Sequence, residues 1–319
     1  MNAVKKLKFN SSSMASLIVL IVLIVLLSII SPNFLKAANL INVMQQVTVN
    51  ALIAIGMMTV ILTSGIDLSV GSVMAISGYV MGTLIINMGV NTFFSVCIGL
   101  LIGVGFGALN GILVAKCRLQ PMIATLGTMQ IARGLTLTMA QGRTISGFTP
   151  TFRWIGTTEL AGIPLQVLLM ILLYILMFYV LKYRKFGRYV YSIGGNEEAT
   201  RLSGINVNRY KIAAYTISGL MSAIAAIVYC AKLNSAVPTA GDGYELDAIA
   251  STVIGGTSLL GGSGSIWGTL FGAIIIGVIK NGLNLMNVSS YLQKVVIGVI
   301  LLVAVLVDSF RAQSSSRKK

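Results

Sequence analysis

The chain runs repeatedly through long apolar stretches, and the first, SLIVLIVLIVLLSII at residues 16–30, contains no charged side chain. Hydrophobic residues make up 56% of the sequence and charged residues 10%, whereas a soluble domain carries roughly 25% charged residues. A helix needs about 20 mainly apolar residues to cross the hydrocarbon core of a bilayer, and these runs are too long for barrel strands. The sequence therefore predicts an all-α integral membrane protein.

The apolar runs and the turn signals between them divide the chain into about ten predicted transmembrane helices. We expect residues 14–308 to form one transmembrane domain, with residues 1–13 and 309–319 as tails and 183–210 as its largest loop on the same side as both tails. The predicted spans are residues 14–31, 39–62, 70–88, 92–115, 120–140, 164–182, 211–231, 247–261, 266–286 and 291–308.

The basic residues predict the orientation of these spans. Sixteen of the 23 Lys and Arg residues fall in segments 1–13, 116–118, 182–211 and 311–319. The opposite loops hold only Lys36, Arg143, Arg153 and Lys232. Because basic residues accumulate on the cytoplasmic side, both termini and the loop at 183–210 are expected in the cytoplasm.

The eighth predicted span is unusual, because the stretch AIASTVIGGTSLLGGSGSIWG carries six glycines. It could cross the membrane, re-enter it or be broken, since irregular backbone is tolerated at that depth only against protein or a water-filled cavity. Its Gly- and Ser-rich turn resembles ILTSGIDLSVGS at residues 61–72. Spans two to five and seven to ten would then form an inverted repeat, as in many transporters.

Several classes of function are excluded or disfavoured by composition. The chain contains no His, which removes imidazole chemistry and His-ligated metal sites. Its three Cys are scattered, so neither a disulfide framework nor a metal site is expected. The net charge of +15 lies in a few loops without interleaved aromatic residues, which favours membrane topology over nucleic-acid binding. No GxxxxGK[ST] motif occurs, so any ATPase must be a separate protein.

Glycines recur at a spacing of four in the predicted fourth span, at Gly99, Gly103, Gly107 and Gly111, with Gly105 outside the series. This spacing places four small residues on one helix face, so that a neighbouring backbone can approach closely. The face could pack inside the subunit or against a second copy, and we favour packing inside the subunit.

Asp67 is the one carboxylate between the second and third predicted spans. It could serve as a proton or cation site, because ionisable residues at membrane depth are usually functional. It could instead cap the third span by accepting bonds from free amides at the helix start. We favour the helix cap.

Polar residues within spans suggest a candidate translocation path for an uncharged polar solute. Gln45, Gln46 and Asn50 lie in the second span, and Asn281 and Asn284 lie in the ninth. Interhelical hydrogen bonding is an equally good interpretation of these residues.

Charged residues of both signs occur in the predicted outer loops. Asp242, Glu245 and Asp247 belong to the segment PTAGDGYELD, and Arg143 and Arg153 belong to the loop at 141–164. Arg143, Arg153, Asp242 and Glu245 are candidate docking residues for a protein outside the membrane, although solvated loop charge explains them equally.

The cytoplasmic stretch YSIGGNEEATRLSGINV predicts a short, well-capped helix. Asn196 is a good N-cap, Glu197 and Glu198 suit the first turn, Arg201 suits the last turn, and Gly204 suits a left-handed C-terminal cap. So short a helix is unstable alone. Its apolar edge, formed by Ala199, Leu202 and Ile205, therefore requires a receiving surface, either on this chain or on a soluble partner.

Four segments of the chain together resemble the membrane permeases of bacterial ribose ABC importers, members of the binding-protein-dependent sugar permease family. The resemblance extends from about Pro32 to Asp308 and departs at both ends and at 141–164. The segments are LTSGIDLSVGS (62–72), GRYVYSIGGNEEATRLSGINVNRYK (187–211), SAVPTAGDGYELDAIASTVIGGTSLLGGSGSIWGTL (235–270) and NGLNLMNVSSY (281–291).

The resemblance implies a non-enzymatic permease subunit in the bacterial inner membrane, which imports a monosaccharide such as D-ribose. It also implies a homodimer, a cytoplasmic ATPase with two nucleotide-binding halves that carries ATP and Mg, and a periplasmic sugar-binding protein. Another pentose or hexose, or a stand-alone secondary carrier, are the alternatives. The implied coupling helix contains Gly195, Asn196, Glu197, Glu198, Ala199, Arg201, Leu202 and Gly204.

Overall fold

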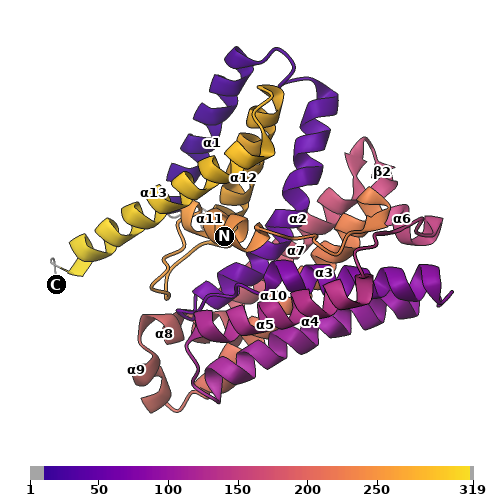
Figure 1. The fold of residues 1–319 in the computed structure, drawn as a ribbon. Helices are drawn as coiled ribbons and strands as arrows, with labels where there is room; N and C mark the ends of the chain where they lie inside the picture. Colours follow the sequence, from indigo (N-terminus) through magenta and orange to yellow (C-terminus); the bar gives the residue numbers. More distant parts are fainter. Residues whose placement is uncertain (1–10, 317–319) are drawn as a thin grey trace, which may run out of the picture.

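A computed structural model describes residues 11–316, which fold into helices joined by short loops (Figure 1). The helices are α1 (Ser11–Ile30), α2 (Ala37–Ile61), α3 (Val70–Gly82) with the π-helical η1 (Thr83–Asn87), α4 (Thr92–Ala115), α5 (Pro121–Ala140), α6 (Pro150–Thr157), α7 (Leu165–Tyr183), α8 (Lys185–Gly195), α9 (Glu197–Leu202), α10 (Val207–Leu233), α11 (Tyr244–Ile254), α12 (Ile266–Leu285) and α13 (Ser290–Ser316).

Two short antiparallel strand pairs lie in the loops of the described residues. Strand β1 (Ile145–Ser146) pairs with β4 (Ser235–Ala236), and β2 (Glu159–Leu160) pairs with β3 (Ile163–Pro164). Because each of these strands has only two residues and the other elements are helices, the prediction of an all-α protein is confirmed. Of the predicted tails, residues 1–10 and 317–319 lie outside the described part, and α13 continues past residue 308 to Ser316.

Seven helical segments of the described chain are long and apolar enough to cross a membrane, namely α2, α3 with η1, α4, α7, α10, α12 and α13. The apolar part of α1, Met14–Ile30, is shorter, and α5 is not among the seven. The predicted count of ten is thus not confirmed.

The predicted crossing at 247–261 is wrong, and the alternative of a broken segment fits the structure. Helix α11 has 11 residues, which span only about 16 Å at 1.5 Å per residue. The glycine-rich residues after it form turns, and Gly256, Gly261 and Gly262 have positive φ. A helix cannot continue through such backbone, because positive φ is left-handed.

Helices α2 and α10 pack against each other at the centre of the molecule. Helix α10 also packs against α3 and α4, and α2 correspondingly packs against α11 and α12. The predicted repeats correspond to α2–α5 and α10–α13. In each repeat the second helix packs against the last one, α3 against α5 and α11 against α13. This matched pattern is the packing expected of the repeat predicted for spans two to five and seven to ten.

The glycine face of α4 packs inside the subunit, as predicted. A Cβ atom at Gly103 would lie 2.4 Å from the Gly219 carbonyl oxygen of α10, and one at Gly107 would lie 2.4 Å from the Tyr215 carbonyl oxygen. At Gly105, by contrast, no atom lies within 4 Å of the added carbon. The helices α4 and α10 therefore touch through their backbones along this face.

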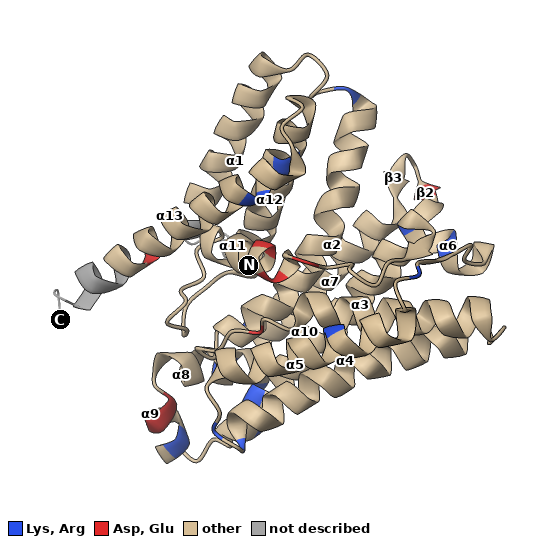
Figure 2. Cartoon of the chain, in the orientation of Figure 1, with Lys and Arg blue, Asp and Glu red and all other residues tan. Residues whose placement is uncertain are grey.

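The segments predicted on opposite sides of the membrane lie at opposite ends of α10. Helices α8 and α9 contact α10 and project beyond the ends of α4, α5 and α10 (Figure 1). Gly156 of α6 packs against Ala231 and Lys232 in the last turn of α10. Lys and Arg residues gather around α8, α9 and the adjoining helix ends (Figure 2), consistent with the charge bias on which the orientation rests.

Candidate functional site

Helix α9 forms with the caps that the sequence predicts. Its N-cap is Asn196, whose side-chain oxygen accepts a hydrogen bond from the Ala199 amide at 2.9 Å. Glu197 and Glu198 occupy the first turn and Arg201 the last. Gly204 has a φ of +79°, a left-handed conformation that glycine adopts at low cost after a helix. The local signals in the sequence therefore predict the position and the caps of this helix correctly.

Glu197 ties α9 to the start of α10. Its carboxylate accepts from the Arg201 guanidinium at 2.8 Å within α9, and from the Lys211 ammonium at 2.5 Å on α10. Burial alone would raise the pKa of the Glu197 carboxyl, but Lys211 and Arg201 outweigh burial and bring the pKa below its ordinary value. Glu198, the other member of the acidic pair, stays exposed.

The outer edge of α9 is apolar and unpacked. The Leu202 side chain is 83% exposed, and Ala199 is also exposed. Thr200 is instead the buried residue of α9, and its hydroxyl donates to the Asn196 carbonyl oxygen at 2.8 Å. Within the described chain, therefore, the predicted apolar edge is largely left uncovered.

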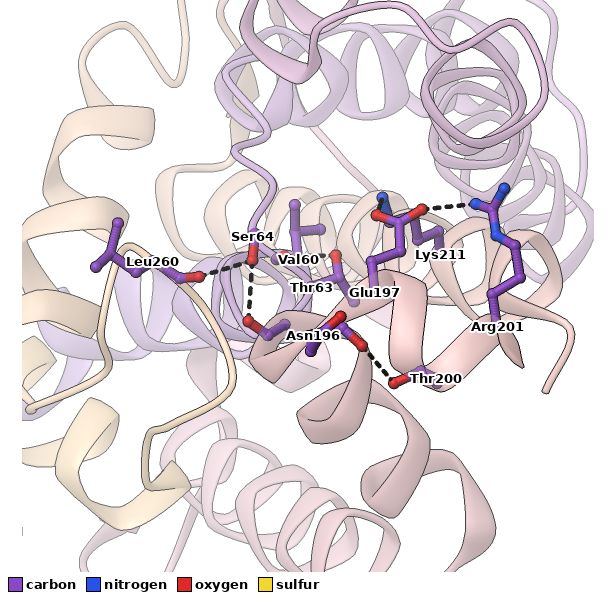
Figure 3. Close-up of polar contacts among 10 residues, drawn as sticks. Val60, Thr63, Ser64, Asn196, Glu197, Thr200, Arg201, Lys211 and Leu260 are labelled. Carbon is purple, nitrogen blue, oxygen red and sulfur yellow. Dashed lines mark hydrogen bonds and ion pairs between the residues drawn. The ribbon is translucent and has the colours of Figure 1, made fainter. Parts of the chain in front are cut away.

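Helix α8, which the sequence analysis did not identify, connects α9 to two turns in the membrane domain (Figure 3). The Ser64 hydroxyl, just after α2, donates to the Leu260 carbonyl oxygen at 2.7 Å and approaches that of Gly194 in α8 at 3.4 Å. The Gly262 amide donates to the Leu62 carbonyl oxygen at 3.1 Å. The two Gly- and Ser-rich turns compared in the sequence thus meet at the end of α8.

Three predicted path residues line a cavity of about 330 Å³ in the membrane domain. Gln45, Gln46 and Asn50 of α2 contribute to one wall. Asn281 and Asn284 do not line it. Asn281 exchanges hydrogen bonds with Asn39 of α2, and Asn284 accepts one from Gln293 of α13. The structure therefore brings the α2 residues together and separates them from the α12 pair.

The sequence analysis missed an ion pair in the same cavity. Asp247, interpreted as an outer-loop residue, belongs to α11 and is buried. Its carboxylate accepts a hydrogen bond from the Lys280 ammonium of α12. The signal that could have revealed the pair was Lys280 itself, a lone cation inside an apolar run that requires a partner.

Asp67 is not the N-cap of α3, because the helix begins after Ser69. Its carboxylate accepts from the Ser69 amide at 3.0 Å, the Ser69 hydroxyl at 2.6 Å and the Ser218 hydroxyl of α10 at 2.8 Å. The side-chain nitrogen of Asn110 on α4 donates to the same carboxylate at 3.4 Å, and the side-chain oxygen of Asn110 accepts from the Thr128 hydroxyl of α5 at 2.6 Å. The prediction is corrected: Asp67 is the centre of a buried polar network that joins α4, α5 and α10.

The candidate docking residues lie around the β1–β4 pair, which joins the loop at 141–164 to the loop at 234–243. Arg143 and Asp242 are exposed, and Arg153 and Glu245 are half-buried. Asp242 forms an ion pair with Lys294 at 3.0 Å. Nothing in these contacts tests docking, which stays a prediction.

In the described part of the chain, no group of three or more His, Cys, Asp or Glu residues could hold a metal ion.

The fold and the motifs define an all-α, multi-pass membrane protein of the transport class, built around two matched helical groups. The chain belongs to the family described as branched-chain amino acid transport system / permease component, which matches residues 39–305.

Similar proteins include three bacterial sugar permeases. The ribose import permease RbsC of Escherichia coli K12 is 50% identical over 298 residues, 92% of each chain. RbsC of Bacillus subtilis 168 is 46% identical over 283 residues, 88% of each chain. The D-allose transport system permease AlsC of E. coli K12 is 39% identical over 281 residues, 88% of this chain and 86% of AlsC. No solved structure matches this chain significantly.

Proposed function

We propose that this chain is the permease subunit of an ATP-driven importer that moves a monosaccharide, D-ribose in the first instance, across the bacterial inner membrane. Two copies would form the pathway, with their termini in the cytoplasm. A separate ATPase with two nucleotide-binding halves would bind ATP and Mg, and a periplasmic protein would deliver the sugar. The ribose import permeases at 46–50% identity support the substrate.

The observation that carries the proposal is the exposed apolar edge of α9, held on a capped helix. Leu202 is 83% exposed, and an apolar side chain so placed on a projecting helix suits a groove in a soluble partner. The ion pair between Glu197 and Lys211 fixes the direction in which α9 projects from α10.

The contacts of α8 suggest how movement of the ATPase would reach the pathway. When ATP draws the two ATPase halves together, α9 would move with them, and α8 would carry the movement to Ser64 and Leu260. Ser64 follows α2 of the first helical group, and Leu260 follows α11 of the second. One rigid displacement would thus act on both repeats at once.

The Leu202→Asp variant tests the docking of α9. A carboxylate in an apolar groove loses the buried contact and must be desolvated, so association with the ATPase should weaken by about tenfold or more. The matched control is Leu160→Asp, because Leu160 is 63% exposed on β2 in the predicted outer loop. Association is measured by co-purification of the epitope-tagged ATPase from detergent. Equal retention by both variants would contradict the proposed role of α9.

Two alternatives differ from this proposal in measurable ways. The fructose import permease FrcC of Rhizobium meliloti is 38% identical, and the L-arabinose permease AraH of E. coli K12 is 37% identical. Competition of these sugars and allose with labelled ribose would rank the substrates. A stand-alone carrier is favoured by the pair of Lys280 with the buried Asp247, and uptake driven by an ion gradient without ATPase would support it.

A further inference from the structure

A cavity inside the single subunit is walled by four helices of both repeats. It lies between α2, α10, α11 and α12 and has a volume of about 330 Å³. This volume is at the lower end of the range of about 300–1,000 Å³ in which proteins bind small molecules. Its polar lining consists of Gln45, Gln46, Asn50, Lys232, Asp247 and Lys280.

The polar atoms of this lining match the needs of hydroxyl groups. A hydroxyl both donates and accepts, so it can bridge an ammonium donor and a carboxylate acceptor that lie side by side. Lys280 and Asp247 provide such a pair. Asn50 contributes to the wall, and its side-chain nitrogen donates to the Ser251 hydroxyl at 2.9 Å.

Two aromatic rings, Tyr229 and Tyr244, also line the cavity. The Lys280 ammonium lies 5.8 Å from the centre of the Tyr244 ring, so the ring and Asp247 together position this cation. Aromatic faces provide an apolar surface of the kind that the carbon–hydrogen face of a sugar ring requires.

A structural role alone gives a weak account of the ion pair. Burying the Asp247 carboxylate costs free energy that an apolar residue of the same size would not, and ionisable residues in membrane segments usually mark solute pathways. Lys280 and Asp247 also line a second cavity of about 350 Å³, together with Asp242 and Lys294. The side chains of Asp242 and Lys294 are 70% and 71% exposed. The Lys280–Asp247 pair therefore lines both the first cavity and a second cavity that reaches an exposed surface.

We propose that the cavity between α2, α10, α11 and α12 is a binding site for a polyhydroxylated solute, whose hydroxyls bind the Lys280–Asp247 pair. This site rests on the proposed transport function and adds to it a place within each subunit where the sugar pauses.

The first experiment measures binding without transport. In a chain with Cys97 and Cys117 replaced by Ser, Gln46→Cys is alkylated in detergent with and without ribose; Cys230 remains because it is buried. Ribose should slow alkylation about threefold or more once the site is mostly occupied. A Lys36→Cys control should be unaffected by ribose. Absence of protection of Gln46→Cys by ribose, or equal slowing in the Lys36→Cys control, would overturn the proposal.

The second experiment separates this site from the function on which it rests. Proteoliposomes with the permease, ATPase and sugar-binding protein are assayed for ribose uptake and for ATP hydrolysis. Lys280→Gln and Asp247→Asn should lower uptake about tenfold, the effect of one lost charged hydrogen bond, while hydrolysis and assembly persist. Lys36→Gln should match the unaltered chain.

Unchanged uptake in both variants, or loss of assembly together with uptake, would overturn the site. If the unaltered chain takes up no sugar with ATP, the transport proposal fails instead. Protection of Gln46→Cys by ribose would still decide whether the cavity binds the solute.

Discussion

The backbone contact between α4 and α10 makes a quantitative prediction for Gly107→Ala. The added Cβ would lie 2.4 Å from the Tyr215 carbonyl oxygen and 3.0 Å from the Thr216 Cα. Because carbon–oxygen contacts are comfortable at about 3.3 Å, the two helices would have to separate by roughly 0.9 Å. Overpacking of this kind costs about 1–3 kcal/mol.

Gly105→Ala is the matched control, since Gly105 lies on the same helix and nothing within 4 Å meets its added carbon. Both changes gain the same helix propensity, about 1 kcal/mol, so the difference between them isolates the helix contact. We expect Gly107→Ala to be less stable than Gly105→Ala by about 1–3 kcal/mol.

The assay is thermal unfolding of the purified permease in detergent, followed by far-ultraviolet circular dichroism. Gly105→Ala should unfold at or above the temperature of the unaltered chain, and Gly107→Ala should unfold below it. Equal midpoints, or a lower midpoint for Gly105→Ala, would refute the conclusion that this face packs against α10 within the subunit.

Three further predictions concern Asp67 and α9. Asp67→Ala leaves the buried hydroxyls of Ser69 and Ser218 without their acceptor, so the free energy of unfolding should fall by about 3 kcal/mol or more, and thermal unfolding in detergent measures it. The lowered pKa of Glu197 means that its attachment to Lys211 is retained above the ordinary pKa and lost as pH falls through the lowered value. Hydrogen exchange of α9, corrected for intrinsic rates, should therefore rise at acid pH in the unaltered chain but show no such step in Glu197→Gln. Ala199→Pro removes the amide that donates to Asn196, so ATP hydrolysis should continue without sugar uptake, and coupled uptake in this variant would contradict the role of α9.

The sequence predicted α9 well because its determinants are local. The Asn196 cap and the left-handed Gly204 are separated by only eight positions, and both act through their own backbone neighbours. Helix α8 was missed because its glycines, at 187, 194 and 195, are poor helix formers. Packing decides its structure: a Cβ at Gly194 would lie 2.0 Å from the Leu62 carbonyl oxygen, so the close approach of the α2 turn requires glycine there.

The spans were predicted from hydropathy, which measures solubility in lipid and not helical continuity. This is why the apolar but glycine-rich stretch after Ile254 was taken for part of a span. The cavity could not be predicted from the sequence, because it is formed by tertiary contacts that hydrophobic periodicity does not encode. Asp247 and Lys280 are 33 positions apart, and Asn281 turned out to bond Asn39 because α12 packs on α2. Polar residues on a span indicate only that some partner exists.

Transport driven by ATP is the central claim, and uptake of labelled ribose into proteoliposomes tests it most directly. The vesicles contain the permease, its ATPase and the sugar-binding protein, with MgATP on the ATPase side. We predict uptake that requires all three proteins and stops when ATP is replaced by a non-hydrolysable analogue. Uptake by the permease alone under a proton or sodium gradient, with no gain from the ATPase and ATP, would contradict the account.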